Sequence, residues 1–331
     1  MRAFDYTSAG TVEEALARLG QAGDGAARPL AGGTDLLTLM KADLVAPGEL
    51  INIKQVADLP RGISAGAGGL AIGALTTLSA IERDPLVRRD YPALAEAAGL
   101  AATPQLRNMA TIGGNLLQRP RCWYFRSPDV RCWLQGGDEC QARDGENQLH
   151  ALFDVSPCVA VHPSDLATAL VALDAAVRLR GPGGERALPL AELLAPPTDE
   201  RRTETTLAAD ELVLSVELPA RPEGARGTYL KAMDRKVWAF ALVGVAAVLR
   251  MGGPGGRRVE EARLVLGGVA PVPWRAAAAE AVLAGAELDE EVAARAAASA
   301  LADARPLAQN GYKLALAEGL IRRALASLAG A

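Results

Sequence analysis

The chain has 331 residues and a formal net charge of −4, with a pI near 5.5. An acidic balance without a basic arm or tail argues against nucleic acid or an anionic membrane surface as the main partner. The length predicts two domains, or three small ones. No apolar run reaches the roughly 18 residues of a membrane span, so we expect none. The N-terminal segment lacks an apolar export core and a twin arginine, which favours a cytoplasmic protein.

A glycine turn follows an apolar segment near the start of the chain. Residues 27–31 predict a short strand, which leads through residues 32–35 (GGTD) into a helix beginning near 36–41. A strand, a glycine turn and a helix present backbone N–H groups to a phosphate. A plain tight turn between a strand and a helix has the same signature. The other elements expected in the first third are helices at 12–20, 79–82 and 91–102 and strands at 49–53 and 69–72.

All four cysteines lie in one stretch, residues 122–158, directly after a second glycine turn at 111–115. Periodicity vanishes over 119–155, as expected of a long loop that is functional or disordered. The loop's aromatic residues argue against disorder. Four thiolates in one loop can bind zinc or an iron–sulfur cluster, or form two disulfides. Without an export signal, thiols or metal ligands are favoured over disulfides.

The cysteine spacing matches no short ferredoxin motif, so spacing alone leaves zinc and iron both open. A nucleotide-type turn beside a metal centre indicates electron transfer.

The remainder of the chain shows regular periodicity again, with a linker over 219–227. The expected elements there are strands at 175–179, 212–218, 239–250 and 259–266 and helices at 166–173, 274–283, 289–302 and 312–328.

Residues for acid–base or nucleophilic catalysis do not form a recognisable set. His150 and His162 are the only histidines, and with four cysteines available we assign both a structural role. No nucleophile–base–orienter pattern and no defensible carboxylate pair is present. The sequence therefore predicts a chain that binds redox groups.

Six motifs carry a family resemblance. They are PLAGGTDLL (29–37), IGALTTL (72–78), PQLRNMATIGGNLL (104–117), HPSDLA (162–167), YLKAMDRK (229–236) and VLGGVAPVPWRA (265–276). In this order they resemble the FAD-carrying medium subunit of the molybdenum hydroxylases, the xanthine dehydrogenase and carbon monoxide dehydrogenase family. The cysteine insertion most resembles the subgroup whose FAD subunit also holds a 4Fe–4S cluster. Within it the heterotrimeric bacterial aldehyde oxidoreductases resemble this chain more than the 4-hydroxybenzoyl-CoA reductases do.

The resemblance implies an α+β fold in two domains. The FAD-binding domain, of the vanillyl-alcohol-oxidase (PCMH) type, would cover 1–222, with lobes 1–56 and 57–222 and the iron–sulfur loop inserted at 119–158. A C-terminal domain of the CO dehydrogenase flavoprotein type would cover 223–331, as a three-stranded sheet with helices.

It also implies a set of binding residues. The first glycine turn would wrap the FAD pyrophosphate, the second would lie across the diphosphate and ribityl chain, Asp165 would bind a cofactor hydroxyl, and Lys231 would lie near the pyrimidine end of the flavin. Arginines of the loop would offset the cluster's negative charge. The implied cofactor-binding residues are Leu30, Ala31, Gly32, Gly33, Thr34, Asp35, Leu36, Leu37, Ala101, Thr111, Gly113, Gly114, Asn115, Asp165, Val213 and Lys231, and the implied cluster ligands are Cys122, Cys132, Cys140 and Cys158.

The implied function is electron transfer as one subunit of three. A large molybdopterin subunit would oxidise the substrate, a small 2Fe–2S subunit would relay electrons, and FAD in this chain would deliver them to an external acceptor such as ferredoxin or O2. The partners could carry the complex to the periplasm by co-export. Alternatives are a self-contained flavoprotein with a zinc-stapled loop, a xanthine dehydrogenase-type or 4-hydroxybenzoyl-CoA reductase-type complex, or a cofactor-free assembly protein.

Overall fold

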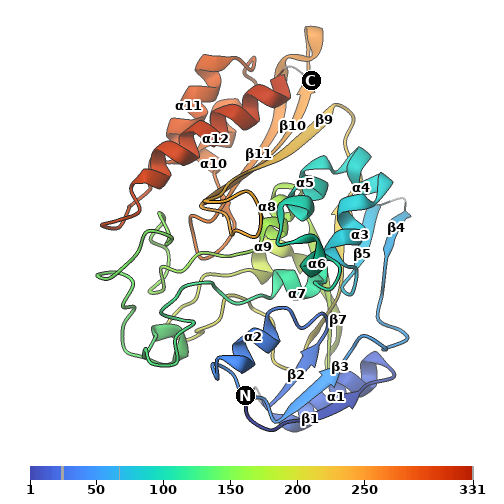
Figure 1. Ribbon diagram of the computed structural model, residues 1–331. Coiled ribbons are helices and arrows are strands. Elements are labelled where there is room, and N and C mark those ends of the chain that lie inside the picture. The colour runs from blue at the N-terminus through green and yellow to red at the C-terminus, as the bar shows by residue number, and fades with distance from the viewer. Residues whose placement is uncertain (24–25, 67, 330–331) are drawn as a thin grey trace.

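The computed structural model describes residues 1–23, 26–66 and 68–329, so the last two residues of the expected C-terminal domain, 330 and 331, lie outside it. The described chain forms three sheets (Figure 1). A small N-terminal sheet lies at one end of the molecule and the C-terminal sheet at the other. The cysteine segment, drawn in green, passes along one side between α2 and the start of α12.

The N-terminal sheet is parallel, with strand order β1-β3-β2. Helix α1 packs on it through an apolar stripe at helical spacing that includes Val12, Leu16 and Leu19. Thr11 begins this helix by accepting a hydrogen bond from the Glu14 N–H. The elements of this part are β1 (Asp5–Ser8), α1 (Val12–Ala22), β2 (Ala27–Leu30), α2 (Leu36–Lys41) and β3 (Glu49–Asn52).

The second sheet has five antiparallel strands in the order β4-β5-β8-β6-β7. Proline stands at the first position of α4, α5 and α6, where a helix needs no N–H donor. The strands are β4 (Ile63–Gly66), β5 (Gly69–Gly73), β6 (Ala176–Gly181), β7 (Gly184–Pro189) and β8 (Leu212–Pro219). The helices are α3 (Leu78–Arg83), α4 (Pro85–Asp90), α5 (Pro92–Leu100), α6 (Pro104–Arg107), α7 (Ile112–Leu116), η1 (Trp133–Gln135), α8 (Asp165–Ala172) and α9 (Leu190–Leu193).

The C-terminal sheet has the order β12-β11-β10-β9, so the expected three-stranded sheet gains a fourth strand of two residues. Trp274 was expected to begin a helix. Instead, Trp274 pairs with Leu266 of β11, and its ring stacks on that of Phe153 with 4.1 Å between the ring centroids. These two contacts keep the segment extended until α10. The elements are β9 (Ala225–Ala232), β10 (Val243–Gly252), η2 (Pro254–Gly256), β11 (Arg258–Gly267), β12 (Trp274–Arg275), α10 (Ala277–Leu283), α11 (Glu290–Ala300) and α12 (Tyr312–Ala329).

Strand β9 joins the C-terminal sheet to the N-terminal part of the chain. The linker expected over 219–227 is shorter, because β8 continues to Pro219 and β9 begins at Ala225. Tyr229 of β9 is buried in the same core as α5 and α8, while the other face of the sheet packs on α10–α12 (Figure 1). The C-terminal sheet therefore lies between two helical layers and borders the candidate site.

Candidate functional site

The first glycine turn follows β2 and leaves its amides open. Gly33 has φ +70°, a conformation that glycine adopts without strain. A Cβ on Gly32 would lie 2.0 Å from the Met109 carbonyl oxygen, so only glycine allows this contact with the segment before the second turn. Within the described residues, the N–H groups of 32–36 donate to no backbone carbonyl. A row of unpaired amides is a site for a phosphate.

The second glycine turn is the first turn of helix α7, and most of its amides are already paired. Thr111 begins the helix by accepting a hydrogen bond from the Gly114 N–H at 3.2 Å. The N–H groups of Ile112 and Gly113 donate to the carbonyls of Thr76 and Ala74. Gly114 is exposed, and a Cβ there would meet only the Thr111 hydroxyl, at 3.2 Å. The turn therefore presents a small, smooth surface beside the first.

A buried ion pair lies next to the second turn. The Ser164 hydroxyl donates to the Asn115 side chain at 2.5 Å and also caps helix α8, which begins at Asp165. Asp165 accepts hydrogen bonds from Lys231 Nζ at 2.7 Å and from the Tyr229 hydroxyl at 2.6 Å. Burial raises the pKa of Asp165, against the positive charge of Lys231. The two charged side chains thus form an ion pair with each other.

The structure brings many, though not all, of the expected cofactor residues together. Lys231 also donates to the Leu100 carbonyl at 3.1 Å, which places Ala101 beside the ion pair. Leu30, Leu36 and Leu37 pack into the apolar cluster under the first turn and anchor it. Ala31 packs against the N-terminal core. Thr34 is half-buried in the turn, and Val213 is buried within the second sheet.

Asp35 connects the first turn to the cysteine loop. Its carboxylate lies 2.8 Å from Arg121 and 2.9 Å from Arg126, and it accepts the Arg119 main-chain N–H at 2.9 Å. The Asp35 side chain therefore binds the loop, and it is the backbone of the turn that is open to a cofactor. The glycine turn and the cysteine loop are held as one unit by this carboxylate.

The four thiols lie close enough to affect one another, and none forms a disulfide. Burial raises the pKa of Cys122 to about 12. A hydrogen bond from Cys158 lowers the pKa of Cys140 to about 6, and the same contact raises that of Cys158. Nearby main-chain N–H groups lower the pKa of each thiol, and the N–H of Ala160 donates to Cys158 Sγ at 3.4 Å.

These N–H groups favour the thiolate form that binds metals. In the described part of the chain, no group of three or more Cys, His, Asp or Glu side chains is arranged to hold a single metal ion. The four cysteines share one apolar cluster, which also includes Leu39, Phe125 and Trp133.

Two further segments hold the cysteine loop. Arg202, between α9 and β8, donates to the carbonyls of Trp133 and Gly137. Its guanidinium carbon lies over the Trp133 ring, 4.7 Å from the ring centroid. Nearby, Arg119 forms an ion pair with the buried Glu204 at 2.8 Å. This contact could not be predicted from sequence, because the segment around residue 202 has no periodic pattern or motif.

Helix α12 holds the other end of the loop. Lys313 is fully buried, and its Nζ donates to the carbonyls of Leu149, His150 and Gly268 at 2.9–3.0 Å. Asn310 is also buried and donates to the carbonyls of His150 and Ala151. Burial lowers the pKa of Lys313 to about 7, whereas the three carbonyls favour its ammonium form. The start of α12 and the residues just before it therefore support the site.

The two histidines differ in their surroundings. His150 Nε2 lies 3.2 Å from Cys122 Sγ, a contact across 28 residues that sequence reasoning missed. His162 is fully enclosed, and its Nδ1 accepts the Ser164 N–H at 3.4 Å. Burial lowers the pKa of each imidazole to about 4, so both are neutral near pH 7.

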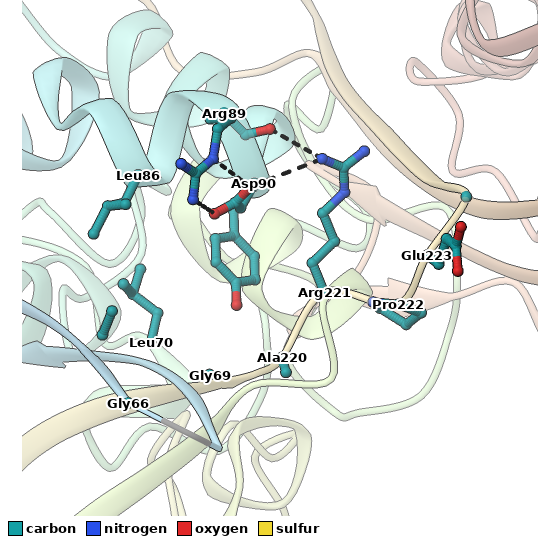
Figure 2. A pocket seen from close by; sticks show the side chains of 13 residues that line it. Gly66, Gly69, Leu70, Leu86, Arg89, Asp90, Ala220, Arg221, Pro222 and Glu223 are labelled. Carbon is teal, nitrogen blue, oxygen red and sulfur yellow. Dashed lines mark hydrogen bonds and ion pairs between the residues drawn. The ribbon is translucent and has the colours of Figure 1, made fainter.

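An open pocket of about 500 Å³ lies away from this site, between the β4–β5 hairpin, α4 and the β8–β9 connection. Figure 2 shows Arg89 and Arg221 on either side of Asp90. Arg89 donates twice to the Asp90 carboxylate, at 2.8 and 2.6 Å, and Arg221 donates to the Arg89 carbonyl at 3.2 Å. Its arginines are already paired, and none of the expected cofactor residues lines it.

The fold and the open amide turn define a protein that binds a nucleotide-type cofactor. Residues 2–221 match the family model described as the FAD-binding domain in molybdopterin dehydrogenase. Residues 228–328 match the CO dehydrogenase flavoprotein C-terminal domain. None of the helices in the described part of the chain has the length and apolar character that a membrane span requires.

Individual proteins show the same relationship. The chain is 42% identical to the aldehyde oxidoreductase FAD-binding subunit PaoB of Escherichia coli, over 98% of both chains. It is 31% identical to the carbon monoxide dehydrogenase medium chain of Hydrogenophaga pseudoflava, over 97% of this chain and 96% of that one. A carbon monoxide dehydrogenase structure from the latter organism superposes with a TM-score of 0.78 at 31% identity, covering 99% of this chain and 97% of that one.

The chain therefore belongs to the family of FAD-binding medium subunits of molybdenum hydroxylases. It is an oxidoreductase subunit. The expected combination of an FAD-binding domain and a C-terminal sheet domain is confirmed.

Proposed function

We propose that this chain carries one FAD and one 4Fe–4S cluster and transfers electrons within a molybdenum-dependent aldehyde oxidoreductase. The observation that carries the proposal is the Asp35 carboxylate, which holds the open glycine turn and the arginines of the cysteine loop together. Two redox groups fixed on one rigid junction can exchange electrons without a large movement of the chain.

The flavin part rests on the first turn and the buried ion pair. The open amides of 32–36 would bind the FAD pyrophosphate, and Gly114 leaves room for the cofactor at the second turn. Lys231, held by Asp165, would supply positive charge near the flavin. When bound, FAD accepts two electrons and can release them singly. The residues of this chain bind it, orient it and tune its charge.

The cluster part rests on the four thiols. Main-chain N–H groups lower the pKa of each thiol, and Arg119 and Arg143 add positive charge near Cys132 and Cys140. Such donors stabilise the negative charge of a thiolate-ligated cluster and influence its potential. Zinc would fit four thiolates but has no redox chemistry. A redox-active cluster suits a loop attached to a flavin turn, and the resemblance of the insertion to the cluster-bearing subgroup favours iron.

The partners and substrate class are proposed by analogy with the relatives. PaoB is named as the FAD-binding subunit of an aldehyde oxidoreductase. By analogy, a large molybdopterin subunit would oxidise an aldehyde and a small 2Fe–2S subunit would pass the electrons to this chain. The flavin would release them to an external acceptor, either ferredoxin, O2 or another oxidant.

Anaerobic purification, with iron, sulfide, zinc and flavin assayed per chain, tests the proposal. We expect about four iron, about four sulfide and about one FAD. One zinc with one FAD would favour the alternative of a flavoprotein with a zinc-stapled loop. A colourless chain without metal would contradict both and favour an assembly protein that keeps the fold.

A further inference from the structure

His150 approaches one of the four cysteine sulfurs from outside the loop's own turns. Its Nε2 lies 3.2 Å from Cys122 Sγ, within the range of an N–H···S hydrogen bond. The residue is buried, and the edge of its ring faces Trp123 at 5.8 Å between centroids. The contact is therefore an enclosed side-chain interaction with a sulfur and is shielded from water.

The direction of this hydrogen bond follows from the chemistry of the sulfur. A thiolate that ligates a metal has lost its proton and can only accept. The proton in the contact must then reside on Nε2 of the imidazole, and His150 is the donor. Within the described residues, His150 is the one side chain other than a cysteine that hydrogen-bonds to one of the four sulfurs, and the Ala160 N–H donates to Cys158 at 3.4 Å.

Helix α12 fixes the position of this donor. The His150 carbonyl accepts from Lys313 Nζ at 2.9 Å and from the Asn310 side chain at 3.2 Å. Its own N–H donates to the Asn147 carbonyl at 3.0 Å. Both side chains, Lys313 in α12 and Asn310 just before it, are fully buried, so the backbone of His150 has little freedom. The C-terminal half of the chain thereby holds the ring against Cys122.

We propose that His150 donates a hydrogen bond from Nε2 to the Cys122 ligand of the cluster and raises the cluster's reduction potential. This inference rests on the proposed 4Fe–4S cluster. The cluster takes up one electron, no bond is broken, and the proton stays on Nε2 throughout. Because the reduced cluster carries more negative charge, the hydrogen bond stabilises it more than the oxidised form. His150 acts through Cys122 and is a positioning and tuning residue.

A matched pair of substitutions in the full-length chain tests the inference. His150→Phe keeps a ring of similar shape but removes the donor, and His150→Gln keeps an N–H near the position of Nε2. The midpoint potential of the cluster is measured by redox titration with EPR detection. We expect His150→Phe to disfavour reduction about tenfold, a potential about 59 mV lower for a one-electron couple. His150→Gln should stay close to the wild type. Equal potentials in all three proteins would overturn the role of His150.

A second measurement needs no substitution, in case His150→Phe fails to retain the cluster. The wild-type chain is labelled with 15N-histidine, reduced, and examined by pulsed EPR for nitrogen coupling to the cluster. We expect one weak histidine coupling, as a hydrogen bond produces. No coupling, or the strong coupling of a direct ligand, would overturn the inference. Wild-type protein without iron would instead show that the proposed cluster is wrong, so the two failures are distinguishable.

Discussion

Lys231 and Asp165 form a buried ion pair, with 2.7 Å between Nζ and Oδ2 and only 1% and 5% of their side chains exposed. The sequence placed each of them separately at the cofactor. In the structure they bind one another and so connect helix α8 of the FAD-binding half to strand β9 of the C-terminal sheet. The charge near the proposed flavin site is therefore set by a pair that also joins the two halves of the chain.

Lys231→Met should destabilise the protein. It leaves the Asp165 carboxylate buried with only Tyr229 as a side-chain hydrogen-bond partner, and breaking a buried pair in this way costs about 3–5 kcal/mol of unfolding free energy. Chemical denaturation of the wild type and the variant measures this difference in unfolding free energy. Arg295→Met removes an exposed pair with Glu291 and serves as the control with little expected effect. Equal stability of Lys231→Met and the control would contradict a structural role for the pair.

Asp35→Asn should lower flavin and iron content together. The substitution removes the negative charge that pairs with Arg121 and Arg126, so the glycine turn and the cysteine loop lose their common anchor. Flavin and iron per chain are measured after identical purification. Asp35 directly precedes helix α2, and Asp43 lies just after its end and is more exposed. Asp43→Asn should leave the flavin and iron contents unchanged. Full FAD and iron in Asp35→Asn would show that the two parts do not depend on this carboxylate.

Gly114→Val should strip FAD while the cysteine loop keeps its metal. A Cβ at this position would meet only the Thr111 hydroxyl within the protein, so the chain should fold, and the two methyl groups would add bulk beside the proposed cofactor. Gly319→Val, on the exposed side of α12, is the control. Flavin absorbance and iron content give the result. Equal loss of both from a folded variant would mean that the cofactor is misplaced.

Removal of the metal should expose one unusually reactive thiol. The hydrogen bond from Cys158 lowers the pKa of Cys140 to about 6, whereas burial raises that of Cys122 to about 12. Because the thiolate is the nucleophile, Cys140 of the metal-free chain should be alkylated first at pH 7. Its rate should rise with pH through about 6 and then level off. Mass spectrometry of iodoacetamide-treated chain checks this order, and faster labelling of Cys122 would refute it.

Some of the site could be predicted from sequence because it is local. The glycine turn at 32–35 and the clustered cysteines are recognisable within short windows. The contacts that complete the site are not local. His150 reaches Cys122, Lys313 reaches His150, and Asp35 reaches Arg126 only after the chain has folded.

Most of the fold could be predicted for the same reason, since the long strands and helices have clear periodicity. The predicted linker over 219–227 overlaps the start of strand β9, because Pro222 and Gly224, which are typical of linkers, lie just before the strand. The two-residue strand β12 has no sequence signature of its own, and it exists because Trp274 stacks on Phe153 of the cysteine segment.

An anaerobic dithionite titration of the purified chain tests the central claim most directly. The account predicts that about three electrons enter per chain, two reducing the flavin and one reducing the cluster, with bleaching of the flavin bands and an EPR signal at low temperature. Uptake of only about two electrons, with flavin bleaching but no EPR signal from a cluster, would contradict the claim that this chain carries both redox groups.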